Sequence, residues 1–136
     1  MIGKLDLTPL ERAVARLAEG LVRYGNDVTD IQIRDGLIQR FEFCYEISHK
    51  MLKRHVEAAS PNPADVDAMT FQDLIRTGSE QGLLLSGWDR WRDFRQARTD
   101  TSHTYDEDKA LRVIAKLPDF LDEARFLLNR LQERNR

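Results

Sequence analysis

The stretch FEFCYEISHKMLK, residues 41–53, decides the fold of this chain. Its apolar residues cover most of the circumference of a helix, while Glu42, Glu46, Lys50 and Lys53 trace one narrow polar strip. A helix that is apolar on more than one side is buried in the centre of a bundle or between two bundles that dimerise. Residues 29–59 contain no proline, so the pattern predicts one helix of about 45 Å over this range.

Amphipathic helices are predicted on both sides of this central helix. Each expected start is a residue whose side chain can accept bonds from free backbone N–H groups. These residues are, in chain order, Thr8, Thr70, Ser86 and Asp106, with Thr104 as the alternative to Asp106. Residues 60–69 hold two of the four prolines and are predicted to form a loop. The chain is therefore expected to be all-α, an antiparallel up-and-down bundle of four to five helices in one domain, residues 1–136.

The overall charge of the chain does not point to any class of binding partner. The chain has 21 basic and 23 acidic residues, a net charge of −2, which gives no general attraction to nucleic acid or to a membrane. No stretch approaches the roughly 18 apolar residues of a membrane span, and the N-terminus lacks the apolar core of a signal peptide. With one cysteine, Cys44, the chain is expected to be a soluble cytoplasmic protein without membrane contact.

Basic residues gather in one segment. Arg90, Arg92, Arg95 and Arg98 lie within nine residues and alternate with Trp88, Trp91 and Phe94, whose spacing is that of a helix. Arginine binds phosphate and aromatic rings stack on bases, so Arg90, Arg92 and Arg95 are predicted RNA-binding residues. The alternative is a solvated arginine face beside an aromatic core stripe.

Arg98 and His103 are the candidate catalytic residues. Arg98 follows Trp91 by seven positions and Phe94 by four, which places it at the edge of the apolar stripe. A guanidinium in that position needs an anionic partner, either a carboxylate or a ligand phosphate. His103 comes near it only if the helix ends between them or a second subunit contributes. Imidazole could move a proton during phosphodiester cleavage while guanidinium neutralises the phosphate; the alternative is a structural ion pair and a capping histidine.

Two blocks carry a family resemblance: FEFCYEISHKMLKRH, residues 41–55, and RTDTSHTYDEDKA, residues 98–110. Together they resemble the nucleotidyltransferase substrate-binding protein family, the HepT group of HEPN domains. The second block contains the R-x4-H-x-Y motif as Arg98, His103 and Tyr105. The chain departs from many members at Thr99, where they have Asn, and at His49, where they often have Trp.

The resemblance implies a helical bundle that homodimerises and is encoded beside a small nucleotidyltransferase of the MntA type. It also implies the toxin of a type VII toxin–antitoxin pair, a metal-independent endoribonuclease that needs no cofactor. Arg98 would hold the scissile phosphate, His103 would act as general acid or base, and Tyr105 would accept AMP from the partner and so silence the enzyme. The alternative is a non-catalytic subunit that presents substrate to, or docks, a separate nucleotidyltransferase.

Other candidate sites are weaker. Cys44, His49 and His55 are five and six residues apart and do not place three metal ligands on one helix face. Glu42 and Glu46 could form a carboxylate pair, but Lys50 is the simpler partner predicted for Glu46. The chain also has no phosphate-binding glycine loop, so nucleotidyl transfer is expected from the partner.

Overall fold

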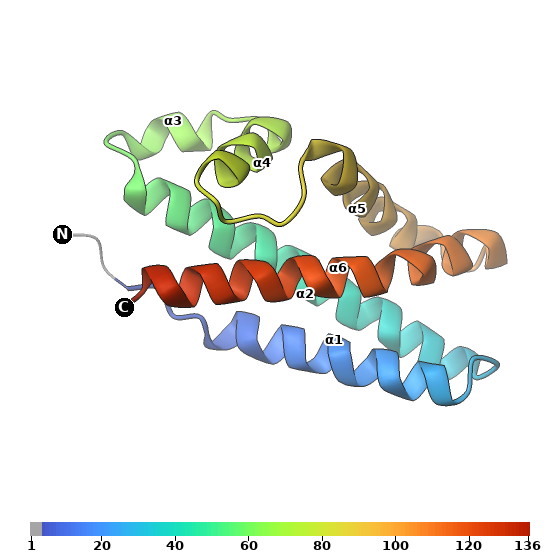
Figure 1. Cartoon of the computed structure of the whole chain (residues 1–136). Coiled ribbons are helices and arrows are strands. Elements are labelled where there is room, and N and C mark those ends of the chain that lie inside the picture. Colours follow the sequence, from blue (N-terminus) through green and yellow to red (C-terminus); the bar gives the residue numbers. More distant parts are fainter. Residues whose placement is uncertain (1–3) are drawn as a thin grey trace.

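The computed structural model of the chain describes residues 4–136, and all regular structure in this range is helical (Figure 1). The helices are α1 Thr8–Asn26, α2 Ile31–Ala59, α3 Pro63–Asp67, α4 Phe71–Glu80, α5 Trp88–Asp100, the 3-10 helix η1 Thr101–His103, and α6 Glu107–Arg134. The all-α prediction is confirmed. One helix was missed, because the five residues of α3 lie within the predicted loop. Within residues 4–136, no helix combines the length and apolar character needed to cross a membrane.

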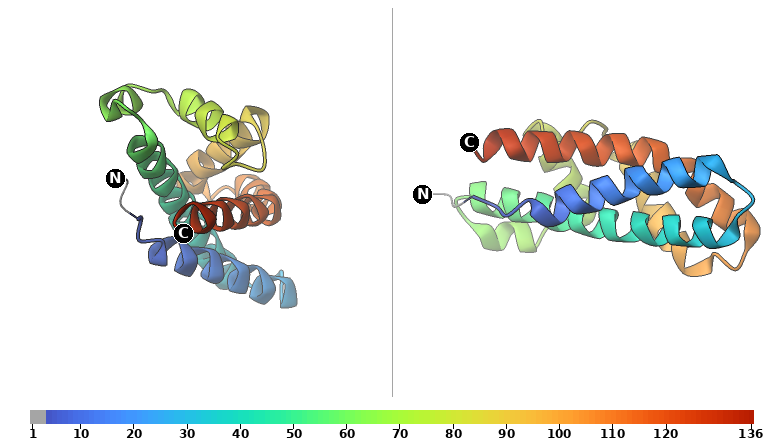
Figure 2. Two further views of the ribbon diagram at one scale, coloured as in Figure 1. Left: turned by 60° about the vertical axis from the view of Figure 1, so that its left-hand side comes forward. Right: turned by 90° about the horizontal axis from the view of Figure 1, so that it is seen from below.

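The three long helices α1, α2 and α6 run side by side, and the shorter helices cover one side of α2 and α6 (Figures 1 and 2). Aromatic rings fill the core where α2, α5 and α6 meet. The ring of Phe120 lies 5.1 Å from that of Phe41 and 5.2 Å from that of Phe94, both edge to face. Trp91 packs against Phe94 in the same way, at 5.5 Å. Such ring pairs add stabilisation beyond the area they bury, and here they fix α5 against the two long helices.

Two of the predicted caps are confirmed and the others are wrong. Thr70 Oγ1 accepts a hydrogen bond from the Asp73 amide, and Asp106 Oδ1 accepts from Asp108 and Lys109 at the start of α6. Thr8 is itself the first residue of α1, which has no side-chain cap. At α5 the cap position is Gly87, so this helix has no side-chain cap, and the backbone amide of Ser86 donates to a carboxylate of α6. Thr104 does not cap α6, since Asp106 occupies that position.

That carboxylate belongs to Glu123, which is fully buried in the middle of α6. Its Oε2 accepts bonds from the amides of Leu85, at 2.7 Å, and Ser86, at 3.4 Å. Burial raises the pKa of Glu123 above its usual value, although these bonds act in the opposite direction. Glu123 thus ties the loop between α4 and α5 to α6, just before α5 begins.

Candidate functional site

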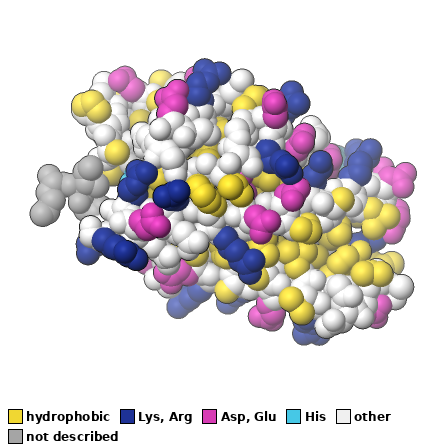
Figure 3. Space-filling view, in the orientation of Figure 1, with side chains coloured by type: hydrophobic (Ala, Val, Ile, Leu, Met, Phe, Trp, Pro, Cys, Tyr) yellow, Lys and Arg dark blue, Asp and Glu magenta, His cyan; other side chains and the backbone are white. Residues whose placement is uncertain are grey.

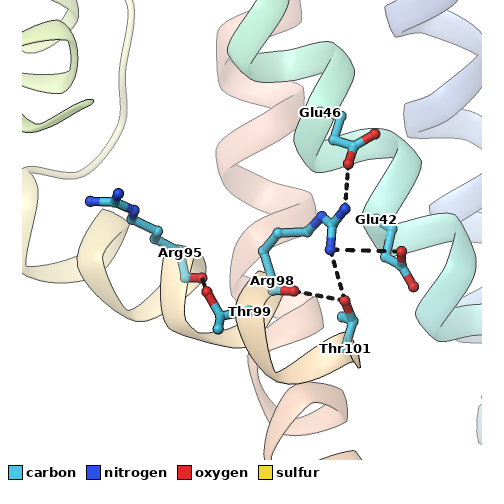
Figure 4. A network of polar contacts seen from close by, with 6 residues as sticks. All are labelled: Glu42, Glu46, Arg95, Arg98, Thr99 and Thr101. Atoms are coloured by element: carbon cyan, nitrogen blue, oxygen red, sulfur yellow. Dashed lines mark hydrogen bonds and ion pairs between the residues drawn. The ribbon is translucent and has the colours of Figure 1, made fainter. Parts of the chain in front are cut away.

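Arg98 lies in the last turn of α5, next to the buried Ala97, and 27% of its side chain is exposed. The hydroxyl of Thr101 donates to the Arg98 carbonyl at 2.7 Å and accepts from the Arg98 guanidinium at 3.0 Å. The backbone and the side chain of Arg98 are therefore both held where the α-helix gives way to η1 (Figure 4).

The guanidinium of Arg98 reaches across to α2 (Figure 4). Its Nη2 donates to Oε1 of Glu46, and its Nη1 lies 3.7 Å from Oε2 of Glu42. The predicted pairing of Glu46 with Lys50 is therefore wrong: within residues 4–136 the ion-pair partner of Glu46 is Arg98. Spacing of three and four along α2 correctly placed the two glutamates on one strip, but it could not reveal a partner 52 residues away.

His103 is the last residue of η1, and Tyr105 lies in the turn that joins η1 to α6. The His103 carbonyl accepts a bond from the Asp106 amide at 3.0 Å, which folds the turn back before α6 starts. The rings of His103 and Tyr105 lie 6.1 Å apart at an angle of 77°. Tyr105 is 88% exposed, and neither side chain makes a hydrogen bond to another residue in the described range 4–136. Both groups are free to meet a ligand.

A buried arginine anchors this turn from the other side. Arg34, near the start of α2, donates to Oε1 of Glu107 at 2.6 Å. The hydrogen bond with Glu107 raises the pKa of Arg34 despite its burial. Because Glu107 is the first residue of α6, the pair joins the motif turn to α2. Sequence reasoning missed Arg34 and Glu107, which are 73 residues apart and carry no local signal.

The structure separates the arginines of α5. Arg90 pairs with Asp119 of α6 at 2.5 Å, and Arg98 faces Glu42 and Glu46. Arg92 and Arg95 instead line one surface hollow of about 340 Å³ on the outer side of α5. Of the three predicted RNA-binding residues, two therefore lie together and Arg90 faces away towards α6.

Two residues of α2 that the sequence analysis considered as metal ligands, His49 and Cys44, are packed against other side chains. The His49 ring packs edge to face on Phe71 at 5.0 Å, and burial lowers the pKa of His49. Cys44 is buried, and burial raises its pKa to about 12, so that it remains a thiol at neutral pH. At position 99, where many relatives have Asn, the Thr99 hydroxyl donates to the Arg95 carbonyl at 3.2 Å (Figure 4).

This arrangement has the chemical parts for acting on a phosphate. A guanidinium at a helix end can bind a phosphate oxygen once its carboxylate partners are displaced. An imidazole on the following turn can transfer a proton. An exposed phenol next to that imidazole can accept a transferred group.

Comparison with known proteins agrees with this picture. The family model described as nucleotidyltransferase substrate binding protein like matches residues 5–133. A protein of Haemophilus influenzae named probable ribonuclease HepT is 38% identical over 143 aligned residues, covering 99% of this chain and 97% of that relative. A solved Haemophilus influenzae structure, described as the fold of a substrate binding domain of a nucleotidyltransferase, matches with a TM-score of 0.87 and 35% identity, covering 93% of this chain and 99% of that one. The chain therefore belongs to the family of nucleotidyltransferase substrate binding proteins.

Proposed function

We propose that this protein is a metal-independent endoribonuclease of the HepT type, the toxin of a type VII toxin–antitoxin pair. The observation that supports the proposal is the succession of Arg98 in the last turn of α5, His103 at the end of η1 and Tyr105 in the turn that follows. The side chains of the histidine and the tyrosine make no hydrogen bond within residues 4–136. The name of the Haemophilus influenzae relative, a probable ribonuclease, supports the same reaction.

In the proposed reaction the 2′-oxygen of a ribose attacks the neighbouring phosphorus, and the bond from phosphorus to the 5′-oxygen breaks. His103 transfers a proton, either from the 2′-hydroxyl or to the leaving 5′-oxygen. Arg98 neutralises the charge that develops on the phosphate oxygens. The phosphate has to compete with Glu42 and Glu46 for the Arg98 guanidinium, because both carboxylates now hold it.

Regulation would act through Tyr105. A nucleotidyltransferase of the MntA type, encoded nearby, would transfer AMP from ATP to the phenolic oxygen and release pyrophosphate. The modified tyrosine would carry a phosphodiester charge and an adenosine two residues from His103, and would repel and obstruct RNA. The 88% exposure of Tyr105 supports this role, since a second enzyme needs direct access to the acceptor oxygen.

The active form is proposed to be a homodimer. Hydrophobic side chains gather on the surface between the first half of α6 and the end of the molecule where α1 meets α2 (Figure 3). Exposed large apolar residues in this part of the chain are Val28 in the loop between α1 and α2, Ile31 at the start of α2, and Leu111 in the first half of α6. Covering this face with a second copy would remove apolar surface from water, and the motif turn, which leads into α6, would lie close to the partner.

The reaction is tested by incubating the purified protein with labelled RNA in EDTA. Wild type is expected to cleave, and Arg98→Ala and His103→Ala to lose at least a hundredfold in rate, the usual effect of removing an acid–base or charge-stabilising group. Glu46→Gln is the matched control, because it breaks the same ion pair but keeps the guanidinium. Equal losses in Arg98→Ala and Glu46→Gln would show that Arg98 serves only the fold.

A second candidate is a non-catalytic subunit that docks a separate nucleotidyltransferase. It is favoured by the carboxylate pair that already satisfies Arg98, and by the description of the solved relative as a substrate binding domain. Incubation with the neighbouring nucleotidyltransferase and ATP separates the two. An AMP adduct on Tyr105 supports the regulated toxin, whereas a stable complex without any adduct or RNA cleavage supports docking.

A further inference from the structure

The outer side of α5 carries a continuous stripe that ends beside the motif. The residues lining its hollow of about 340 Å³ are Trp88, Arg92, Arg95, Gln96 and Thr99. Their spacing of three and four places them on one side of the helix, over a length of about 16 Å. Thr99 immediately follows Arg98, so the stripe leads directly to the end of α5 at which η1 and His103 begin.

The positive charge in this hollow is not neutralised. Arg90 and Arg98 have carboxylates within 4.0 Å, whereas Arg92 and Arg95 have none among residues 4–136. In Figure 4 the Arg95 side chain extends away from the cluster of Glu42, Glu46 and Arg98. Two arginines without carboxylate partners along one helix face form a local positive site on a chain whose net charge is −2.

Aromatic rings lie in and under the same surface. The Arg95 guanidinium lies over the ring of Phe71, 5.3 Å from its centroid, and the ring of Trp88 packs edge to face on Phe71 at 5.9 Å. Trp88 is only partly buried and lines the hollow. Stacking on Phe71 limits the freedom of Arg95 and so lowers the entropic cost of binding an anion there. Trp88 offers a surface on which a base can stack.

We propose that this hollow binds the single-stranded RNA next to the scissile phosphate, with Arg92 and Arg95 on backbone phosphates and Trp88 stacked on a base. The inference rests on the proposed ribonuclease function and names where its substrate lies. A strand running along the stripe of about 16 Å would place more than one nucleotide on it and deliver the next phosphate to Arg98. Gln96 and Thr99 supply hydrogen-bonding groups between the arginines and the motif.

A second copy of the chain fits the hollow less well than RNA does. In a two-fold interface centred on this surface, Arg92 and Arg95 would face the same arginines of the other copy. Like charges placed opposite each other disfavour association, whereas phosphates neutralise them. The hollow is also polar and charged, unlike the apolar face assigned to the dimer.

The test measures binding of a short fluorescein-labelled single-stranded RNA by anisotropy, in a His103→Ala protein so that cleavage cannot interfere. Arg92→Gln and Arg95→Gln should each weaken binding about fivefold at 0.1 M salt and lower the slope of log K against log salt by about 0.7, the effect of one lost phosphate contact. Trp88→Ala should weaken binding roughly fivefold or more, and Trp88→Phe should restore most of it. Arg125→Gln is the matched control, because Arg125 is exposed on α6 and does not line the hollow.

Unchanged affinity and salt slope in Arg92→Gln and Arg95→Gln, with folding verified by circular dichroism, would overturn the inference. So would a pair of variants that bind RNA normally but lose their complex with the partner nucleotidyltransferase, because the hollow would then be a protein-docking surface. Failure of the ribonuclease proposal is a different result. A wild-type protein that binds RNA through this hollow without cleaving it supports the binding site and contradicts the reaction.

Discussion

Arg98 is an arginine shared between two glutamates of another helix and the hydroxyl of Thr101. Its side chain is 27% exposed, and that of Glu46 is 56% exposed. Ion pairs with this much contact with solvent contribute about 1 kcal/mol or less to the free energy of unfolding. The ion pairs of Arg98 are therefore expected to contribute little to the free energy of unfolding, so a phosphate can replace the carboxylates at little cost to the fold.

The first prediction concerns this separation of roles. Arg98→Ala and Glu46→Gln should each lower the free energy of unfolding by about 1 kcal/mol or less, measured by urea denaturation. A loss of about 3 kcal/mol or more in Arg98→Ala is typical of a buried pair that has lost one partner, and it would assign Arg98 to the fold.

Tyr105 gives a second prediction. Tyr105→Phe should fold with unchanged stability, because the side chain is 88% exposed, and should still cleave RNA. It should not take up AMP from the partner enzyme and ATP, as judged by intact-protein mass spectrometry. Tyr24→Phe, with its hydroxyl removed elsewhere on the chain, should still take up AMP; modification of Tyr105→Phe would place the acceptor at another residue.

At the scale of single helices, Asp106 connects stability with the site. Its carboxylate caps α6 by accepting from two amides, at 3.0 and 3.3 Å, and its own amide bonds to the His103 carbonyl. Asp106→Ala should cost about 0.5–2 kcal/mol of unfolding free energy, measured in urea. Asp122→Ala, an exposed change in the interior of α6, should cost much less. Equal effects would mean that the cap does not stabilise the helix.

The raised pKa of Glu123 predicts that the stability of the protein depends on pH. Its pKa in the folded protein lies above the usual value of about 4.5, so in the pH range above 4.5 the folded state binds more protons than the unfolded state. The stability of wild type should then fall as pH rises through the folded pKa. Glu123→Gln lacks this titration, so its stability relative to wild type should rise between pH 4.5 and 7. A difference in stability between the two proteins that does not change with pH would contradict the raised pKa of Glu123.

Local signals predicted the helices well and their details less well. Asp106 and Thr70 were found because a cap is a contact between near neighbours. Ser86 was wrong because α5 starts at Trp88 with Gly87 at the cap position, and the loop before it is held by Glu123, 37 residues from Ser86. The motif residues could be named from sequence, but the partners of Arg98 and the anchor from Arg34 to Glu107 arise only when distant helices pack. Nothing in the sequence distinguishes Glu123 from an ordinary polar residue of α6.

For the whole molecule, the apolar face between α1, α2 and the first half of α6 predicts a dimer at micromolar concentration, measured by light scattering (Figure 3). Leu111→Glu should shift the protein towards monomer, because a buried carboxylate without a partner is costly. Leu85→Glu alters a similarly exposed leucine in the loop before α5 and should remain dimeric. A monomeric wild type would contradict the dimer.

The central claim is a ribonuclease that AMP on Tyr105 silences. It is tested most directly by following RNA cleavage in EDTA with one preparation of the protein, before and after treatment with the neighbouring nucleotidyltransferase and ATP. We predict that the untreated protein cleaves, that activity falls in proportion to the fraction carrying AMP on Tyr105, and that Tyr105→Phe stays active after the same treatment. Equal cleavage with and without the adduct, or no cleavage by the untreated protein, would contradict the claim.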